Sequence, residues 1–137
     1  MLVIVLLSTA MILVVDDEAA YQEVLAKMLT KVGYRVITAA DGNEALTLLQ
    51  NSHFDLIISD IFMPNLNGYA LAARIRAKDP NVPIILISGY LSQDTAKNLL
   101  GGSTEYIAKP VDSELMIATV HRLMSSGGKK GDSVKSA

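Results

Sequence analysis

Short apolar runs alternate with segments of helical spacing along most of this chain, and this alternation restricts the possible folds more than any other feature. Apolar runs that are typical of strands occupy residues 12–15, 34–39, 54–59, 82–88 and 105–108. Apolar residues three or four positions apart predict helices at about 19–31, 42–50, 69–77 and 93–100, and a last helix after Pro110. Because parallel strands need a crossover connection, usually a helix, this order predicts an α/β fold with a mostly parallel five-stranded sheet.

Individual residues mark where the predicted elements begin and end. Gly33 is placed to end the first helix. Asp41 and Glu44 have the spacing of a capping box, with Asp in place of Ser or Thr, at the start of the second helix. The run at 54–59 is almost continuously apolar, as expected of a strand that is covered on both faces. It is therefore predicted as a central strand of a sheet with helices on both faces.

The two ends of the chain differ in composition from the part between them. Residues 1–10 are apolar and uncharged, but no Lys or Arg precedes Lys27, and Asp16 interrupts the run short of the roughly 20 residues of a membrane span. We therefore interpret 1–10 as an upstream extension or a start-site artefact. Residues 11–124 are predicted to form one domain, and residues 125–137 a disordered tail or linker.

The composition excludes several kinds of site. The chain has no cysteine, which excludes disulfides, thiolate catalysis and cysteine-bound metals and fits a cytoplasmic location. His53 and His121 lack the spacing of metal ligands, so we expect both at the surface. The net charge is only −2, so no overall basic field favours nucleic acid, and we expect neither direct nucleic-acid binding nor membrane binding.

Polar side chains follow the predicted strands at their carboxyl ends. Asp16 and Asp17 follow the first strand, Asp60 follows the third, Ser88 ends the fourth and Lys109 follows the fifth. Ligands of open parallel sheets bind outside these ends, so we expect the five side chains to converge. Three crowded carboxylates repel one another unless a hard cation that prefers oxygen ligands lies between them, and Mg²⁺ is the natural candidate.

Four segments of this chain resemble the signature segments of response-regulator receiver domains. They are VVDDE (14–18), SDIFMPNLNGYAL (59–71), LISGY (86–90) and EYIAKPVD (105–112). The resemblance covers Met11 to about Met124. It implies a flavodoxin-like (βα)5 fold with the strand order 2-1-3-4-5 and helices on both faces.

The resemblance also implies a role for each acidic position. Asp60 would be the phosphoacceptor, which takes a phosphoryl group from the phosphohistidine of a sensor histidine kinase or a histidine phosphotransfer protein. Asp17, Asp60 and the backbone carbonyl of Phe62 would bind Mg²⁺ directly, and Asp16 would act through a water molecule. Lys109 would place its ammonium group against the phosphoryl oxygens.

The resemblance further implies that the domain is a switch more than an enzyme. Ser88 would act in the catalytic site with Asp60 and Lys109, since its hydroxyl would bond the phosphoryl oxygen. Ser88 and Tyr106 would move after phosphorylation and remodel the surface that contacts an unknown downstream protein or a second copy of the chain in a phosphorylation-dependent homodimer. The bulky Phe62 and Tyr90 predict slow self-dephosphorylation. Pro110 is expected to follow a cis peptide bond, as the corresponding proline of the family does.

Other interpretations remain open beside this one. A lone strand-end aspartate is more often a turn residue, and Glu18 is interpreted as a helix-start acid and not as a metal ligand. A phosphorylation-independent pseudo-receiver would keep the fold without the chemistry. A phosphatase or hydrolase of the haloacid-dehalogenase type would require Asp-x-Asp after the first strand, where this chain has Asp16-Asp17. A nucleotide- or flavin-binding module is disfavoured because no G-x-G-x-x-G or P-loop follows a strand.

Overall fold

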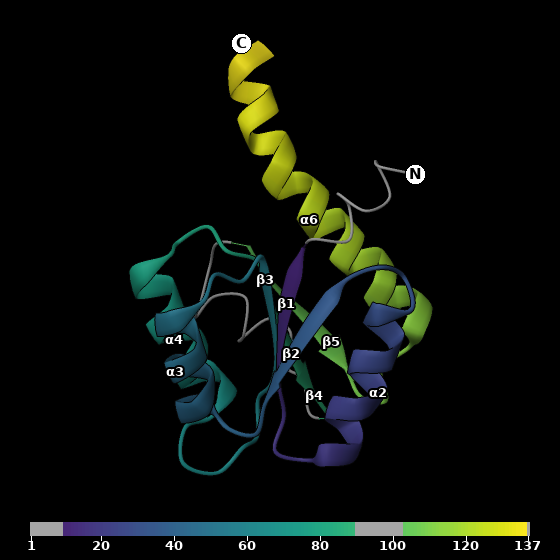
Figure 1. Cartoon of the computed structure of the whole chain (residues 1–137), viewed down its shortest axis with the longest axis vertical. Coiled ribbons are helices and arrows are strands. Elements are labelled where there is room, and N and C mark those ends of the chain that lie inside the picture. Colours follow the sequence, from purple (N-terminus) through teal and green to yellow (C-terminus); the bar gives the residue numbers. More distant parts are fainter. Residues whose placement is uncertain (1–9, 90–102, 137) are drawn as a thin grey trace.

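A five-stranded parallel sheet forms the centre of the molecule (Figure 1). The computed structural model describes residues 10–89 and 103–136, with side chains up to residue 125. The strand order is β2-β1-β3-β4-β5 and every neighbouring pair is parallel, so the predicted fold class and order are confirmed. The strands are β1 (Met11–Val15), β2 (Arg35–Ala39), β3 (Leu56–Asp60), β4 (Ile84–Ser88) and β5 (Thr104–Ala108).

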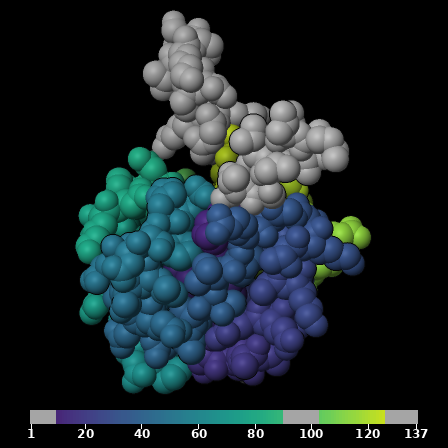
Figure 2. All heavy atoms as spheres, viewed as in Figure 1, coloured from purple at the N-terminus to yellow at the C-terminus, as the bar shows by residue number. Residues whose placement is uncertain are grey.

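Helices cover both faces of the sheet, as the sequence predicts (Figure 1). α3 (Gly42–Asn51) and α4 (Gly68–Lys78) lie on one face, and α2 (Ala19–Thr30) and α6 (Ser113–Ser136) lie on the other. The helix predicted at about 93–100, with its capping residue Ser92, lies outside the described residues. In the space-filling view, the atoms of α3, the edge strand β2 and α2 form one continuous surface in front of the other strands (Figure 2).

The core is divided into two layers by the alternation of side chains along each strand. On β1, Leu13 and Val15 pack toward α3 and α4, whereas Ile12 and Val14 pack toward α2 and α6. All residues of β3 and β4 are buried, which explains their almost continuous apolar sequence. The predicted apolar face of the last helix is confirmed because Met116, Val120 and Leu123 belong to the second layer.

Local signals place the helix ends close to where the sequence predicts them. The Asp41 side chain accepts a hydrogen bond of 2.8 Å from the Glu44 amide. The Glu44 carboxylate accepts from the amide of Ala40, one residue before the position that a standard capping box uses. Gly33 follows α2 with φ of 103°, a conformation that glycine adopts without steric cost.

The structure describes the C-terminal end of the chain but not residues 1–9, so it bears on only one of the two predicted domain boundaries. Residues 1–9 lie outside the described part, so the interpretation of 1–10 as an extension stays a prediction. The backbone of α6 is helical as far as Ser136, where the sequence predicts a disordered tail or linker from residue 125. Helical hydrogen bonds join residues four positions apart, so a helix can continue beyond its last packed turn. Composition alone does not reveal such a continuation. Among the described residues, no helix has the length and apolar content to cross a membrane.

A glycine at the start of α4 allows this helix to approach the end of β3. The amide of Gly68 donates a 2.8 Å hydrogen bond to the carbonyl of Ile61. A Cβ atom at Gly68 would clash with the backbone carbonyl oxygen of Asp60 and would lie 2.8 Å from the Cα atom of Ile61. Since both neighbours are backbone atoms, they cannot move aside as a flexible side chain would.

We expect Gly68→Ala to lower the free energy of unfolding by about 1–3 kcal/mol, as overpacking of a rigid site does. Urea denaturation measures this change. Gly89→Ala is the matched control because a Cβ atom at Gly89 would meet no atom of the described residues within 4 Å. Equal stability of the two variants would contradict the prediction.

Candidate functional site

Three aspartates meet at the carboxyl ends of β1 and β3. Val15 and Ser59 are partners in the β1–β3 register, so Asp16 lies level with Asp60 on the neighbouring strand. A carboxylate oxygen from each of Asp16, Asp17 and Asp60 lies within 4.8 Å of the others. Asp16 is fully buried and Asp60 is 6% exposed, whereas Asp17 is exposed. The parallel register therefore concentrates negative charge at one end of the sheet, as the sequence predicts.

Asp16 is the most constrained of the three carboxylates. Its Oδ1 accepts a 2.9 Å hydrogen bond from the Glu18 amide. Its Oδ2 has no hydrogen-bond partner among the described residues, although this atom is buried. Burial raises the pKa of Asp16, and the charges of Asp60 and Asp17 raise it further, while the Glu18 amide and Lys109 oppose the shift without cancelling it.

Lys109 brings a positive charge to this cluster. Its Nζ lies 3.2 Å from Oδ2 of Asp60, 3.7 Å from Oδ2 of Asp16 and 3.8 Å from Oε1 of Glu18. Its amide donates to the carbonyl of Ser88, and the peptide bond to Pro110 is cis, as expected. Burial alone lowers the pKa of Lys109, but the charges of Asp16 and Asp60 outweigh burial and hold this pKa above its usual value.

The two predicted switch residues lie on neighbouring strands. Ser88 is fully buried at the end of β4, where its register partner is Ala108. Tyr106 is half-buried on β5, opposite Leu86, and packs against the core layer beneath α3 and α4. Burial raises the pKa of the Tyr106 hydroxyl, and Tyr69 adds to the shift. The movements that the resemblance implies for these two residues stay predictions.

Phe62 lies in the loop that follows Asp60, and its side chain is 59% exposed. The loop turns tightly here, since Asn65 has φ of 70°. Tyr90 lies outside the described residues. The predicted role of the Phe62 carbonyl as a metal ligand therefore stays a prediction.

The sequence analysis missed two residues that support the cluster. The face of the Tyr21 ring lies 4.3 Å from Nζ of Lys109, measured to the ring centroid. Nε2 of Gln22 donates to the carbonyl of Asp16 at 2.7 Å and to that of Ala39 at 3.3 Å. Both residues lie in the first turn of α2, just after the aspartate pair, and this position is the signal that makes them candidates.

Glu18 lies at the start of a helix and the two histidines lie at the surface, as the sequence predicts. Glu18 is the N-cap residue of α2 and is not among the three residues that could hold a metal ion in the described part of the chain. Its carboxylate nevertheless lies near Lys109. His121 and His53 are exposed and contact Tyr34 and Asp55, respectively.

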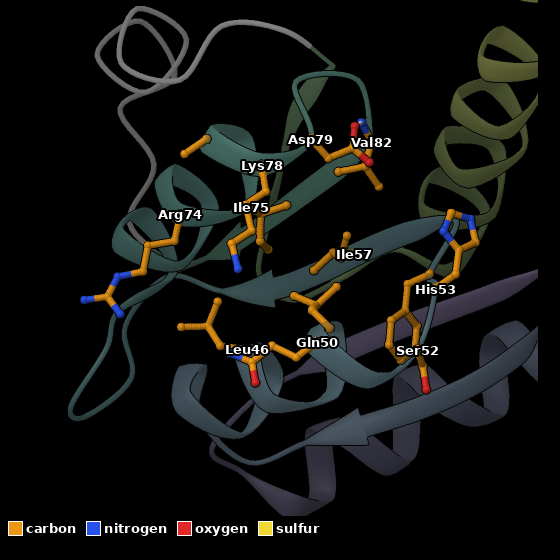
Figure 3. A pocket seen from close by; sticks show the side chains of 13 residues that line it. Leu46, Gln50, Ser52, His53, Ile57, Arg74, Ile75, Lys78, Asp79 and Val82 are labelled. Atoms are coloured by element: carbon orange, nitrogen blue, oxygen red, sulfur yellow. Dashed lines mark hydrogen bonds between the residues drawn. The ribbon is translucent and has the colours of Figure 1, made fainter.

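A pocket of about 490 Å³ lies away from this cluster, between the C-terminal ends of α3 and α4 (Figure 3). Its floor is apolar and includes Phe54, Ile57 and Ile75. In the close-up, the amine of Lys78 points into the pocket and the guanidinium of Arg74 points away (Figure 3). None of the three clustered aspartates lines it. The pocket is therefore separate from the carboxylate site.

The carboxylate cluster fits a hard divalent cation. The possible ligand atoms are carboxylate oxygens that together carry negative charge. Mg²⁺ prefers oxygen ligands to nitrogen or sulfur ligands. Oδ2 of Asp16 is a buried acceptor that receives no hydrogen bond from the described residues and lies 3.7 Å from Nζ of Lys109, so it could still accept from a metal-bound water. The fit rests on these atoms and on their separation of at most 4.8 Å.

The sheet order and the cluster together define an α/β domain with an acidic site at the carboxyl ends of its strands. The family model for the response regulator receiver domain matches residues 12–121. The chain therefore belongs to the response-regulator receiver family, which acts in two-component systems.

Known proteins similar to this chain agree with that assignment. A probable transcriptional regulator, ycf27 of Cyanophora paradoxa, is 38% identical over 82% of this chain and 47% of its own length. Chemotaxis protein CheY4 of Vibrio cholerae has a TM-score of 0.77 and 31% identity, covering 84% of this chain and 98% of that one. TrrA of Thermotoga maritima, solved in complex with Mg²⁺-BeF, has a TM-score of 0.76 and 34% identity over 84% and 99% of the two chains. The chain spans about half the length of the curated relatives it matches first.

We expect Asp17→Asn to raise the free energy of unfolding by a few tenths to about 1 kcal/mol in metal-free buffer, because it removes one of three mutually repelling carboxylates. Denaturant titration with EDTA measures the change, which should shrink as salt screens the repulsion. Glu23→Gln is the control because Glu23 is an exposed acid of α2 that pairs with Lys27. A stability loss in Asp17→Asn larger than that of the control would rule out repulsion as the dominant effect.

Proposed function

We propose that this domain is a phosphorylation-dependent switch in which Asp60 accepts a phosphoryl group from the phosphohistidine of a sensor histidine kinase or a histidine phosphotransfer protein. The observation that carries the proposal is the position of Asp60. Its carboxylate lies at a strand end within the acidic cluster, with the Lys109 ammonium 3.2 Å away. Membership of the receiver family supports the same assignment.

The residues of the site suit an in-line phosphoryl transfer. A carboxylate oxygen of Asp60 attacks phosphorus, an acyl phosphate bond forms, and the bond to the donor histidine nitrogen breaks with its electron pair leaving on that nitrogen. Lys109 places positive charge where the phosphoryl oxygens arrive. Asp17, Asp60 and the Phe62 carbonyl would hold Mg²⁺, with Asp16 acting through water. When bound, this ion supplies the charge neutralisation that the transfer needs.

The consequence of phosphorylation in this proposal is a change of surface. The Ser88 hydroxyl bonds a phosphoryl oxygen, and Tyr106 turns further into the core, so that the equilibrium between two packings shifts. The changed surface then contacts a downstream protein or a second copy of the chain. We place this switch in the cytoplasm. We also propose that the domain has no separate substrate, although it catalyses its own phosphorylation and slow dephosphorylation.

Incubation with acetyl phosphate, with and without Mg²⁺, tests the site directly. Intact-mass spectrometry should show a gain of one phosphoryl group that requires both Mg²⁺ and Asp60 and is lost in Asp60→Asn. Asp41→Asn is the matched control because Asp41 lies outside the cluster and asparagine preserves its capping role.

An established receiver labelled in parallel shows that the reagent is active. If that receiver is labelled and this chain is not, phosphorylation at Asp60 is refuted and the pseudo-receiver interpretation replaces it. Labelling that persists in Asp60→Asn would place the phosphoryl group elsewhere.

We expect Phe62→Ala to shorten the lifetime of the phosphorylated form. The Phe62 side chain is large and exposed two residues beyond Asp60, where it would limit the approach of water to the acyl phosphate. The decay of the phosphorylated mass after removal of acetyl phosphate measures this lifetime. Val24→Ala, at another exposed apolar side chain in the middle of α2 and outside the cluster, provides the comparison. An unchanged lifetime in Phe62→Ala would exclude this shielding.

A further inference from the structure

One aromatic side chain contacts the ammonium of Lys109, which carboxylates of Asp16, Glu18 and Asp60 also approach. Tyr21 lies in the first turn of α2, and its ring centroid is 4.3 Å from Nζ of Lys109. This distance lies well within the range in which the negative face of an aromatic ring attracts a cation. The Lys109 side chain is only 20% exposed, so water screens the attraction less than it would at the surface.

The same side chain also contacts the backbone beyond Lys109. The Tyr21 hydroxyl accepts a 3.1 Å hydrogen bond from the amide of Val111. Val111 is two residues after Lys109, and its side chain packs against the core layer beneath α2 and α6. Tyr21 therefore connects α2 to both ends of the short segment that carries the lysine.

The ring differs in its chemistry from the other partners of Lys109. Asp60, Asp16 and Glu18 are anions within 3.8 Å of Nζ, and each competes with an incoming phosphoryl group for the ammonium. An aromatic face attracts the cation without adding a negative charge that would neutralise it. Such a contact keeps the lysine in place and leaves it able to act.

We infer that Tyr21 is a positioning residue for Lys109 in phosphoryl transfer. The ring fixes the ammonium beside Asp60, and the hydroxyl fixes the backbone segment from Lys109 to Val111. This inference rests on the proposed function, because positioning matters to the rate only if Asp60 accepts a phosphoryl group. Its geometric part can be measured without any phosphorylation.

The test compares Tyr21→Leu, which removes ring and hydroxyl, with Tyr21→Phe, which removes the hydroxyl alone. The first measurement is the NMR shift of the Lys109 ε-methylene group in ¹³C-lysine-labelled protein, assigned with Lys109→Arg. The second is the rate of labelling by acetyl phosphate, and the third is the affinity for Mg²⁺. Tyr21→Met serves in place of Tyr21→Leu if the latter does not fold.

We expect Tyr21→Leu to shift the Lys109 resonance, because the ring current is lost, and to slow labelling about threefold to tenfold, as loss of a partly buried cation–π contact would. The affinity for Mg²⁺ should stay within about twofold, since the carboxylates are unchanged. Tyr21→Phe should keep the ring-current shift and most of the labelling rate. Tyr34→Leu is the matched control because Tyr34 packs in the same core layer but bonds His121.

The outcomes separate this inference from the proposed function. Equal labelling rates in wild type and Tyr21→Leu, or an unmoved Lys109 resonance, would overturn the positioning role alone. If Tyr34→Leu slows labelling by the same factor, the effect comes from a general loss of stability, and this result would also overturn the positioning role. A wild-type chain that acetyl phosphate does not label would refute the proposed function, and the positioning role with it, even if the Lys109 resonance still reported the ring contact.

Discussion

The repulsion among three aspartate carboxylates that lie close together is the constraint on which the rest of this structure depends. The register of β1 and β3 brings carboxylate oxygens of three aspartates within 4.8 Å, and two of the three residues are buried. Within the described part of the chain, the basic side chain that contacts this group is Lys109. Such crowding opposes folding when no cation is bound, so stability must come from elsewhere in the domain.

The two core layers supply that stability and fix the geometry of the site. β3 and β4 are buried along their whole length between the two pairs of helices, which leaves the strand ends little freedom to separate. Gly68 permits α4 to lie against the backbone of Asp60, and Gln22 joins the ends of β1 and β2 through its amide. The carboxylates of the site therefore repel one another, while the surrounding core holds their positions fixed. This combination is typical of functional sites.

Particular elements show how far sequence reasoning extends. The strand ending in Asp60 was predictable because a continuous apolar run implies burial on both faces, and the start of α3 because Asp41 and Glu44 bond within one turn. The convergence of Asp16, Asp60 and Lys109 followed from the rule for strand ends. The helical backbone beyond residue 124 was not predicted, since composition there favours disorder. The contact between Tyr21 and Lys109 was not predicted either, because it joins residues far apart in the sequence.

The sequence by itself determined the order and type of the elements, because hydrophobic periodicity, caps and glycines act over a few neighbouring residues. It also determined which polar residues end the strands. The tertiary structure alone decided the distances: 3.2 Å from Lys109 to Asp60, 4.3 Å from Lys109 to the Tyr21 ring, and a buried Asp16 oxygen without a hydrogen-bond partner among the described residues. These quantities depend on how α2 and the end of β5 pack against the sheet, and packing couples residues that no local pattern connects.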